Sequence, residues 1–362
     1  MEVEVRVLLL ADGRSVHTVR YQRELKRQGV EIILASLERG ETVDVQLKKK
    51  SVSNSLNYFF VNREISELVR KTDPDLVNPH FASGYGFSTA VSRAGKNRPV
   101  ILHCLGSDIL VSPKKSVAHK RKVIFALSKA SHILVDSNFL AGKVSELYKS
   151  ANIDVIPWGV EQEILDLYDS KAKTETAIAE PLKVLVPRPH NPVYNNLFII
   201  EALKELINKG RLSLFFPNWG DDRDKFKAEV SRLCPNGGVE YYDFKPRDDY
   251  ISFLGQFDIY LSAAYSDSSP ASLIEAMAAG LYPVAADIPG VREWLDGSNG
   301  VLYPPNDRGA LADVFKKAMA RPDDLTGILS ANHERVKATA VISDNIKKTI
   351  EIMERLISGE RR

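Results

Sequence analysis

Residues 270–280 read PASLIEAMAAG and follow a short loop that contains Asp267, Ser268 and Ser269. The loop and the helix-like segment lie between two segments typical of buried strands, QFDIYLSAAY at 256–265 and LYPVAADI at 281–288. After Pro270 the composition is that of a helix, rich in Ala, Leu, Ile, Glu and Met, and Gly280 is a typical helix stop. The sequence therefore predicts a strand, a loop, a helix and a second strand in succession, the repeating unit of a parallel α/β sheet.

The loop at 266–272 follows the first of these strands and leads into the helix. In open α/β sheets, ligands bind at the carboxyl ends of the strands. A helix N-terminus there offers free N–H groups and positive potential to an anion such as a diphosphate. Two carboxylates bracket the helix start, Asp267 in the loop and Glu275 one turn into the helix. On their own they would be interpreted as a helix cap and a solvated helical residue.

The longer run at 266–307 resembles the donor-site signature of retaining glycosyltransferases of the GT-B fold, above all family four; from Pro270 it reads PASLIEAMAAGLYPVAADIPGVREWLDGSNGVLYPPND. That signature is Glu-x7-Glu, Ala-Met-Ala-x-Gly, Pro-Val-x-Ala, a Pro-Gly turn and Gly-x-Leu-x-Pro-Pro-x-Asp. The chain departs from it at the first Glu, which is Asp267. A match of this length is specific. It implies an α/β fold of two Rossmann-like domains that face a cleft, with a C-terminal helix crossing back to the first domain.

Length and composition agree with two domains. A chain of 362 residues is long for one α/β domain, and 44% hydrophobic with 27% charged residues is ordinary for a globular protein. We expect an N-terminal acceptor-side domain at 1–165, a C-terminal nucleotide-sugar domain at 166–342 and a last helix at 343–362 that packs on the first domain. The polar run KAKTETAIAE at 171–180 is typical of a linker.

Cysteine usage and hydropathy favour a cytoplasmic protein. Cys104 and Cys234 cannot form a disulfide framework, and so few cysteines fit a reducing compartment. The chain starts with a short strand pattern instead of a signal peptide, and no run reaches the roughly 18 apolar residues of a membrane helix.

Charge is distributed unevenly along the chain. Residues 1–160 hold 24 Lys and Arg against 16 acids, whereas the remainder holds 25 against 31. Basic clusters occur at 48–50, 114–115 and 120–122. They are interpreted either as solvated surface or as a basic half that contacts an acidic acceptor or the anionic inner face of the membrane. Nucleic acid is not expected, because aromatic residues are not interleaved with these charges.

The first residues predict a Rossmann-like unit without a nicotinamide fingerprint. A strand at 4–10 leads through a short loop to a helix at 15–29 and a second strand, but G-x-G-x-x-G is missing. In the resembled family, a Gly-rich turn in this loop meets the donor phosphate, and Gly13 is the one glycine here. His17 is interpreted either as a core or capping residue or as a cleft residue.

Two further histidines follow predicted strands. His80 precedes a glycine-rich loop, and PVILHCLGSDIL at 99–110 places His103 at a strand end, with Ser107 and Asp108 just beyond. A lone histidine at a strand end is more often structural. This run, however, resembles the family's strand that ends in His followed by Gly-Ser-Asp, in which the His helps to hold the donor sugar. The acceptor-side or cleft candidates are therefore His17, His80, Ser107 and Asp108.

The second half departs from the family at two positions. DVIPWGVE at 154–161 resembles the family's interdomain hinge, with Trp158 in place of Asn. In the family, an Arg after the first strand of the second domain and a Lys about five residues later clamp the diphosphate. Arg188 matches, but Val193 and Tyr194 occupy the place of the Lys. A tyrosine donates only a neutral hydrogen bond, which is weaker than a charged one.

By resemblance, Glu275 would hold the ribose hydroxyls, Asp267 would lie near the hydroxyls of the donor sugar, and residues around Phe244 would line the base pocket. Asn218 stands where the family has a Gly-x-Gly turn. The predicted catalytic residues are His103, Asp267 and Glu275. The predicted donor and phosphate-binding residues are Gly13, Arg188, Tyr194, Asn218, Phe244, Ser268, Ser269, Ala271, Ser272, Leu273 and Glu275.

These residues predict transfer of a sugar from a nucleoside diphosphate sugar to a glycan, lipid-linked or small-molecule acceptor. Arg188 and the helix start supply positive potential for the leaving diphosphate. The chain lacks the Asp-x-Asp metal motif and any ligand-spaced His/Cys/Asp cluster, so we expect neither a metal nor a cofactor. Retention of configuration is implied by the resemblance. Two alternatives are a nucleotide-sugar epimerase of the same fold and a related protein that binds without turnover.

Overall fold

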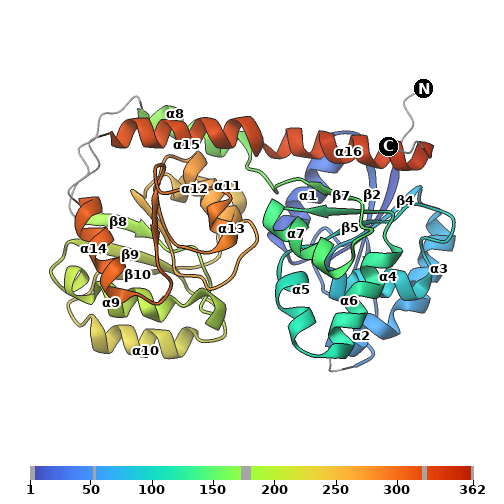
Figure 1. Cartoon of the computed structure of the whole chain (residues 1–362), viewed down its shortest axis with the longest axis horizontal. Helices are drawn as coiled ribbons and strands as arrows, with labels where there is room; N and C mark the ends of the chain where they lie inside the picture. The colour runs from blue at the N-terminus through green and yellow to red at the C-terminus, as the bar shows by residue number, and fades with distance from the viewer. Residues whose placement is uncertain (1–4, 52–53, 173–180, 320–323, 360–362) are drawn as a thin grey trace. The chain divides into compact units, whose positions relative to one another are not determined.

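The computed structural model describes residues 5–51, 54–172, 181–319 and 324–359. The chain divides into two compact units, Met1–Trp158 with Ile342–Arg362, and Gly159–Val341 (Figure 1). Each unit is a Rossmann-like domain around parallel strands, and this confirms the predicted fold class.

The boundary between the units lies before Gly159, seven residues ahead of the predicted end of the first domain at 165. Helix α8 (Gln162–Ala172) explains the difference, because Ile164 and Leu165 are fully buried in a core of the second unit. The polar run 171–180, predicted as a linker, begins within α8, and its remainder lies outside the described residues.

The second unit contains a six-stranded parallel sheet in the order β10-β9-β8-β11-β12-β13. The chain builds outward from β8 in one direction and then from β11 in the other, so the order reverses between these two neighbours. Such a topological switch point is where open α/β sheets bind ligands. The strands are β8 (Leu182–Leu185), β9 (Leu212–Pro217), β10 (Val239–Tyr242), β11 (Ile259–Ser262), β12 (Tyr282–Ala286) and β13 (Val301–Tyr303).

Side chains alternate along these strands and fill two cores, one on each face of the sheet. Val184 and Leu261 pack against α9, α10 and α14, whereas Leu185 and Tyr260 pack against α8, α11, α12, α13 and α15. The helices are α9 (Asn196–Asn208), α10 (Arg223–Leu233), α11 (Arg247–Leu254), α12 (Ala271–Ala278), α13 (Pro289–Arg292), α14 (Arg308–Met319) and α15 (Leu325–Thr339).

The first unit repeats this plan. Its strands run in the order β3-β2-β1-β4, and parallel bridges from Val77 to Val100 and from His80 to His103 continue the sheet into β5-β6-β7. The switch point here lies between β1 and β4. The strands are β1 (Arg6–Leu10), β2 (Glu31–Ser36), β3 (Val45–Gln46), β4 (Leu76–Pro79), β5 (Ile101–His103), β6 (His132–Val135) and β7 (Ile153–Val155).

The last helix, α16 (Ile342–Ser358), belongs to the first unit and packs beside α1 (Val16–Arg27) (Figure 1). Met353 and Leu25 share a core, and Gln28 donates a hydrogen bond to the Ser343 carbonyl at 2.9 Å. The other α-helices of this unit are α2 (Asn54–Phe60), α3 (Asn62–Thr72), α4 (Phe87–Ser92), α5 (Ser107–Leu110), α6 (Val117–Lys129) and α7 (Asn138–Leu147). Within the described ranges, no helix has the length and apolar character needed to span a bilayer.

Candidate functional site

An ion pair bridges the switch point of the second unit. Arg188 follows β8, Asp267 follows the neighbouring strand β11, and the Arg188 Nη2 to Asp267 Oδ2 distance is 2.5 Å. Both side chains are largely withdrawn from solvent, with exposed fractions of 13% and 19%. The two residues predicted to bind the donor diphosphate and sugar therefore contact each other in this structure.

Arg188 remains a cation in this buried position. Burial opposes its charge, but Asp267, Tyr260 and Tyr194 outweigh burial and raise the pKa of the guanidinium. The Tyr194 ring lies 5.2 Å from the guanidinium carbon, a cation–π contact. The Nε atom is buried without a well-formed hydrogen bond to any described residue. The guanidinium thus keeps hydrogen-bonding capacity that Asp267 does not use.

The interpretation of Asp267 as a helix cap is wrong. Its Oδ1 accepts a hydrogen bond from Ser268 N–H at 3.0 Å, and the N-cap of α12 is Pro270. Among the described residues, no side chain caps α12. Its positive end, with the backbone at Ala271 and Ser272, is therefore available to an anion.

The serines of the loop fix its shape. Ser269 Oγ accepts from the Trp294 indole at 2.9 Å, and Ser272 Oγ lies 3.3 Å from the Tyr260 hydroxyl. Ser268, Ser269 and Leu273 are buried. Since these side chains are engaged within the fold, a phosphate at this loop would be contacted through its backbone.

Gly290 lets α13 approach this loop closely. A Cβ at Gly290 would lie 2.3 Å from the Asp267 carbonyl oxygen and 2.4 Å from that of Ser268. Any other residue would displace the backbone that carries Asp267. Gly290 of the Pro-Gly pair is therefore needed for the close packing of α13 against the loop as well as for the turn of the chain.

The interpretation of Glu275 as a solvated residue is also wrong, because only 6% of it is exposed. Arg247 Nη2 donates to Glu275 Oε1 at 2.6 Å and to Glu161 Oε2 at 2.6 Å, and its Nε donates to Glu161 Oε1 at 3.0 Å. Sequence reasoning missed Arg247 and Glu161. The available signal was a lone arginine opening α11 in the run FKPRDD.

Aromatic residues follow the next two strands of the sheet. Phe244, after β10, is 70% exposed, and its ring lies 6.5 Å from that of Trp219, which follows β9. Asn218 donates to Asp243 at 2.7 Å and so joins the two loops. A Cβ at Gly220, where φ is +126°, would lie 2.2 Å from the His190 backbone nitrogen, so a glycine is required there.

The first unit gathers three predicted histidines at its own switch point. His80 and His103 have ring centroids 4.7 Å apart, and His17 stacks on Trp158 at 5.3 Å. Trp158 also stacks on His103 at 5.7 Å. Tyr21, which the sequence did not single out, contacts His80, His103 and Trp158 by its edge or face.

Burial keeps the inner two histidines neutral. It lowers the pKa of His103 to about 3, and burial with His103 and His17 lowers the pKa of His80 well below its ordinary value. Tyr21 donates to Asn78, whose amide donates to His103 Nδ1 at 3.2 Å. His80 is 2% exposed, and neither of its ring nitrogens has a hydrogen-bond partner among the described residues.

The remaining predicted residues of this unit have other surroundings. Gly13 donates its N–H to Ser36 Oγ at 3.0 Å, so this group is already occupied. Asp108 is completely buried and accepts from the Ala82 and Leu105 N–H groups, and burial raises its pKa to about 6. These contacts hold loops together. Ser107 is exposed at the start of α5.

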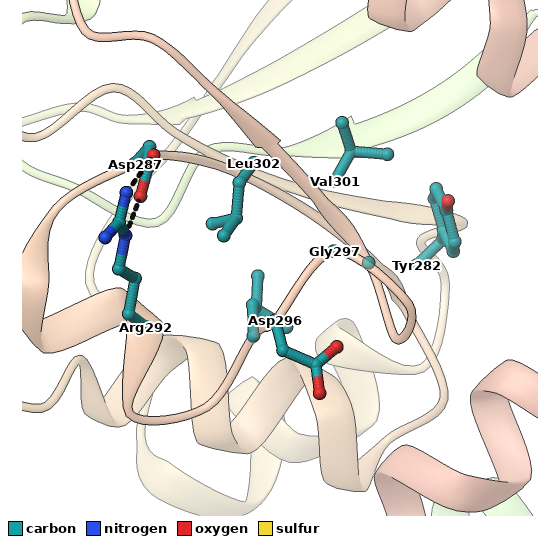
Figure 2. Close-up of a pocket in the computed structure, with 9 residues that line it drawn as sticks. Tyr282, Asp287, Arg292, Asp296, Gly297, Val301 and Leu302 are labelled. Atoms are coloured by element: carbon teal, nitrogen blue, oxygen red, sulfur yellow. Dashed lines mark hydrogen bonds and ion pairs between the residues drawn. The ribbon is translucent and has the colours of Figure 1, made fainter.

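A cavity of about 570 Å³ lies elsewhere in the second unit, along β12 and β13 (Figure 2). Tyr282, Asp287, Arg292 and Leu302 are among its lining residues, and Arg292 Nη2 donates to Asp287 Oδ2 at 2.7 Å. It contains neither Arg188 nor Glu275 and lies toward the sheet edge. Size alone does not place the site there, because the buried charges converge at the switch point.

Comparison with known proteins agrees with this geometry. Residues 6–137 match the family model Glycosyl transferase 4-like, and residues 171–335 match Glycosyl transferases group 1. TuaC of Bacillus subtilis (strain 168), whose name assigns it to teichuronic acid biosynthesis as a glycosyltransferase, is 24% identical over 281 residues, 74% of this chain and 69% of its own.

Two solved structures share the fold. Sucrose-phosphate synthase from Thermosynechococcus elongatus has a TM-score of 0.82 at 14% identity, with 98% of this chain and 100% of the other covered. Anabaena Alr3699/HepE in complex with UDP-glucose has a TM-score of 0.76 at 17% identity, with 97% and 100% covered.

Proposed function

We propose that this glycosyltransferase, built from a glycosyl transferase 4-like domain and a group 1 domain, transfers a sugar from a nucleoside diphosphate sugar to an acceptor hydroxyl. The proposed transfer retains the anomeric configuration and serves the assembly of a polysaccharide. The observation that carries this proposal is the cation Arg188 beside the open N-terminus of α12, at the switch point of the second unit. A diphosphate placed there would meet positive potential from these groups once it takes the place of Asp267 on the guanidinium.

The order of the strands supports a place for each part of the donor. The diphosphate lies outside β8 and β11, while the exposed ring of Phe244 lies outside β10. Two strand positions separate β8 from β10, on the order of 10 Å, which is comparable to the length of a nucleoside. A base stacked on Phe244 and Trp219 would therefore reach the diphosphate at Arg188. UDP sugars are the first donors to test, because HepE is described with UDP-glucose.

The proposed reaction breaks the bond between the anomeric carbon and the β-phosphate oxygen, and the electron pair leaves with the diphosphate. The acceptor oxygen attacks the same face of the sugar ring, and its proton passes to the leaving phosphate oxygen. Arg188 and the backbone at 268–272 stabilise the negative charge that develops. These protein groups supply positive potential in place of the lysine expected near Tyr194, so the reaction is proposed to need no metal.

One observation favours the second candidate, a protein that binds donor without turnover. Asp267 already occupies the guanidinium of Arg188, and the family's second cation is replaced by neutral Tyr194. A weakened phosphate clamp of this kind would hold a nucleotide and transfer its sugar slowly or not at all.

A panel assay distinguishes the candidates. The protein is incubated with uridine, guanosine and adenosine diphosphate sugars, with and without lipid-phosphate and oligosaccharide acceptors, and nucleotide release is followed. Acceptor-dependent release with retained anomeric configuration is expected. Isomerised donor without acceptor would identify an epimerase, whereas tight nucleotide binding with no product for any pair would identify the binding protein.

We also propose that the first unit contacts anionic lipid. Residues 81–129 contain nine Lys or Arg and a single acid, Asp108, which is buried. Helices α2, α4 and α6 pack together in this unit (Figure 1). Exposed apolar side chains accompany the charges, namely Leu56, Phe59, Phe60 and Val117. Lysine around exposed aromatic and aliphatic side chains is typical of a surface that lies on a bilayer.

Vesicle co-sedimentation tests this contact. We expect binding to vesicles with phosphatidylglycerol and loss of binding with phosphatidylcholine alone or at high salt. The double variant Phe59→Ser/Phe60→Ser should weaken binding. Lys316→Glu/Lys317→Glu, on α14 of the other unit, is the control and should bind as the unaltered protein does. Equal binding to both kinds of vesicle would exclude the charge-based contact.

A further inference from the structure

One buried arginine joins three segments that are distant in sequence. Arg247 opens α11, Glu161 immediately precedes α8, and Glu275 lies in α12. The exposed fractions of the three side chains are 14%, 19% and 8%. Buried charges are costly unless each has a partner of opposite sign and well-formed hydrogen bonds. The arrangement therefore needs a reason beyond packing.

The hydrogen bonds divide the guanidinium between the two carboxylates. Glu161 accepts from Nε and from Nη2, so it occupies one edge of the planar group and fixes that plane. The same Nη2 also donates to Glu275 Oε1. Because the plane is fixed by Glu161, the direction of the N–H that reaches Glu275 is fixed as well. A lysine could supply the charge at this place, but not the planar set of N–H donors that contacts both carboxylates.

The charge of Arg247 also matters for what binds nearby. Burial opposes the charge on Arg247, but Glu275 and Glu161 outweigh burial and raise its pKa, so the guanidinium stays protonated. It offsets the negative charge of Glu275 at the helix end where a diphosphate would approach. Without it, two buried carboxylates would remain together, which favours uptake of a proton.

We propose that Arg247 is a positioning residue for the donor. Held in plane by Glu161, it holds Glu275 in a fixed position beside the start of α12, so that this carboxylate can accept hydrogen bonds from donor hydroxyls. The inference rests on the proposed function and deepens it, since it adds the pair that prepares the ribose-binding residue.

The first test measures binding of UDP-glucose by calorimetry, or of whichever panel donor the unaltered protein turns over. Arg247→Met is expected to weaken binding on the order of tenfold to a hundredfold. Arg247→Lys keeps a positive charge but loses the planar pair of N–H donors, so its affinity for the donor should lie between those of Arg247→Met and the unaltered protein. In turnover assays the KM for the donor should rise, while the KM for the acceptor stays unchanged.

The second test uses pH, which a purely structural role would not affect. The charged and titratable groups that face Glu275 include Arg247, Tyr242 and Tyr250, and Glu161 shares Arg247 with it. Burial raises the pKa of both tyrosines, so they stay neutral. In Arg247→Met, donor affinity should fall more steeply on acidification than in the unaltered protein, because the cation that offsets the two buried carboxylates is gone. Adding Glu161→Gln should reduce this pH dependence, because one of the two like charges is removed, without restoring the affinity.

Arg232→Met is the matched control. Arg232 forms an exposed pair with Glu229 in the same unit, so its variant should bind donor as the unaltered protein does. The inference is overturned if Arg247→Met binds donor normally while Glu275→Gln does not. It is also overturned if donor affinity falls only in proportion to the melting temperature across all Arg247 variants. If the unaltered protein binds no donor of the panel, the proposed function itself fails.

Discussion

The two units share one order of strands around their switch points, but the side chains placed there differ in kind. The second unit carries fixed charges in close pairs, Arg188 with Asp267 at 2.5 Å and Arg247 with Glu275 at 2.6 Å. The first unit carries His80 and His103, which burial keeps neutral, against Tyr21 and Trp158. The fold thus gives each unit a switch point, and the side chains there determine whether it is charged or neutral.

The difference follows from what burial does to each kind of group. A guanidinium buried beside a carboxylate keeps its charge, whereas an imidazole buried without one loses it. Charged groups suit a diphosphate, and neutral donors and acceptors suit the hydroxyls of a sugar.

The largest effect is expected for Arg188→Met. Loss of a fixed cation at the leaving group should lower kcat by about 10²- to 10³-fold. Arg188→Lys should recover part of the loss, because it restores charge without the second N–H. Steady-state kinetics with the best panel donor measure this, and calorimetric unfolding shows whether the variant is folded. A kcat within a factor of about three of the unaltered protein would contradict the assignment of Arg188 to the leaving group.

In the neutral site, His103 should make stability depend on pH. Its pKa is about 3 in the folded protein and about 6.5 when unfolded, so the unfolded chain binds the extra proton between these values. Stability is therefore fully present above about pH 6.5 and is lost as pH falls, by about 2 kcal/mol at pH 5. His80, whose pKa is also lowered, contributes with the same sign.

The measurement compares His103→Asn with the unaltered protein from about pH 7 to about pH 5 by urea unfolding. Asp108 acts with the opposite sign, because its pKa is raised to about 6, and the comparison cancels its contribution. The variant should lose less stability on acidification. Parallel curves for the two proteins would show that His103 is protonated when folded, and the contrast between the sites would fail.

A smaller effect of opposite sign is expected when Asp267 loses its charge. Asp267 occupies the guanidinium that the diphosphate would use, so Asp267→Asn should bind UDP up to about tenfold more tightly, although turnover falls. Asp267→Glu introduces the residue found in the resembled signature. It keeps the charge and lengthens the side chain by one methylene, so it separates the effect of side-chain length from that of charge. Calorimetry with UDP measures the affinities, and weaker UDP binding by Asp267→Asn would show that the carboxylate supports the phosphate site instead of competing for it.

The sequence predicted the strand, loop and helix around Pro270, and the family resemblance singled out Arg188, Asp267 and Glu275. It did not predict that each carboxylate has an arginine partner. Arg247 lies 28 residues before Glu275 and 86 after Glu161, and nothing in local periodicity reports such contacts. The burial of Glu275 could not be predicted either, because it depends on the packing of α8 and α15 against α12 and on the contact with Arg247.

The smallest effect is expected at the cavity in Figure 2. Arg292 there contacts Asp287 through two hydrogen bonds, an arrangement that resembles the Arg247 fork, but its side chain is 66% exposed. Exposed ion pairs contribute little, and this pair lies away from the switch point. Arg292→Met should therefore change donor affinity and kcat less than about twofold and stability by at most about 1 kcal/mol. A fall in kcat as large as that expected for Arg188→Met would move the site to this cavity, because bidentate geometry alone, without burial at the switch point, would then suffice.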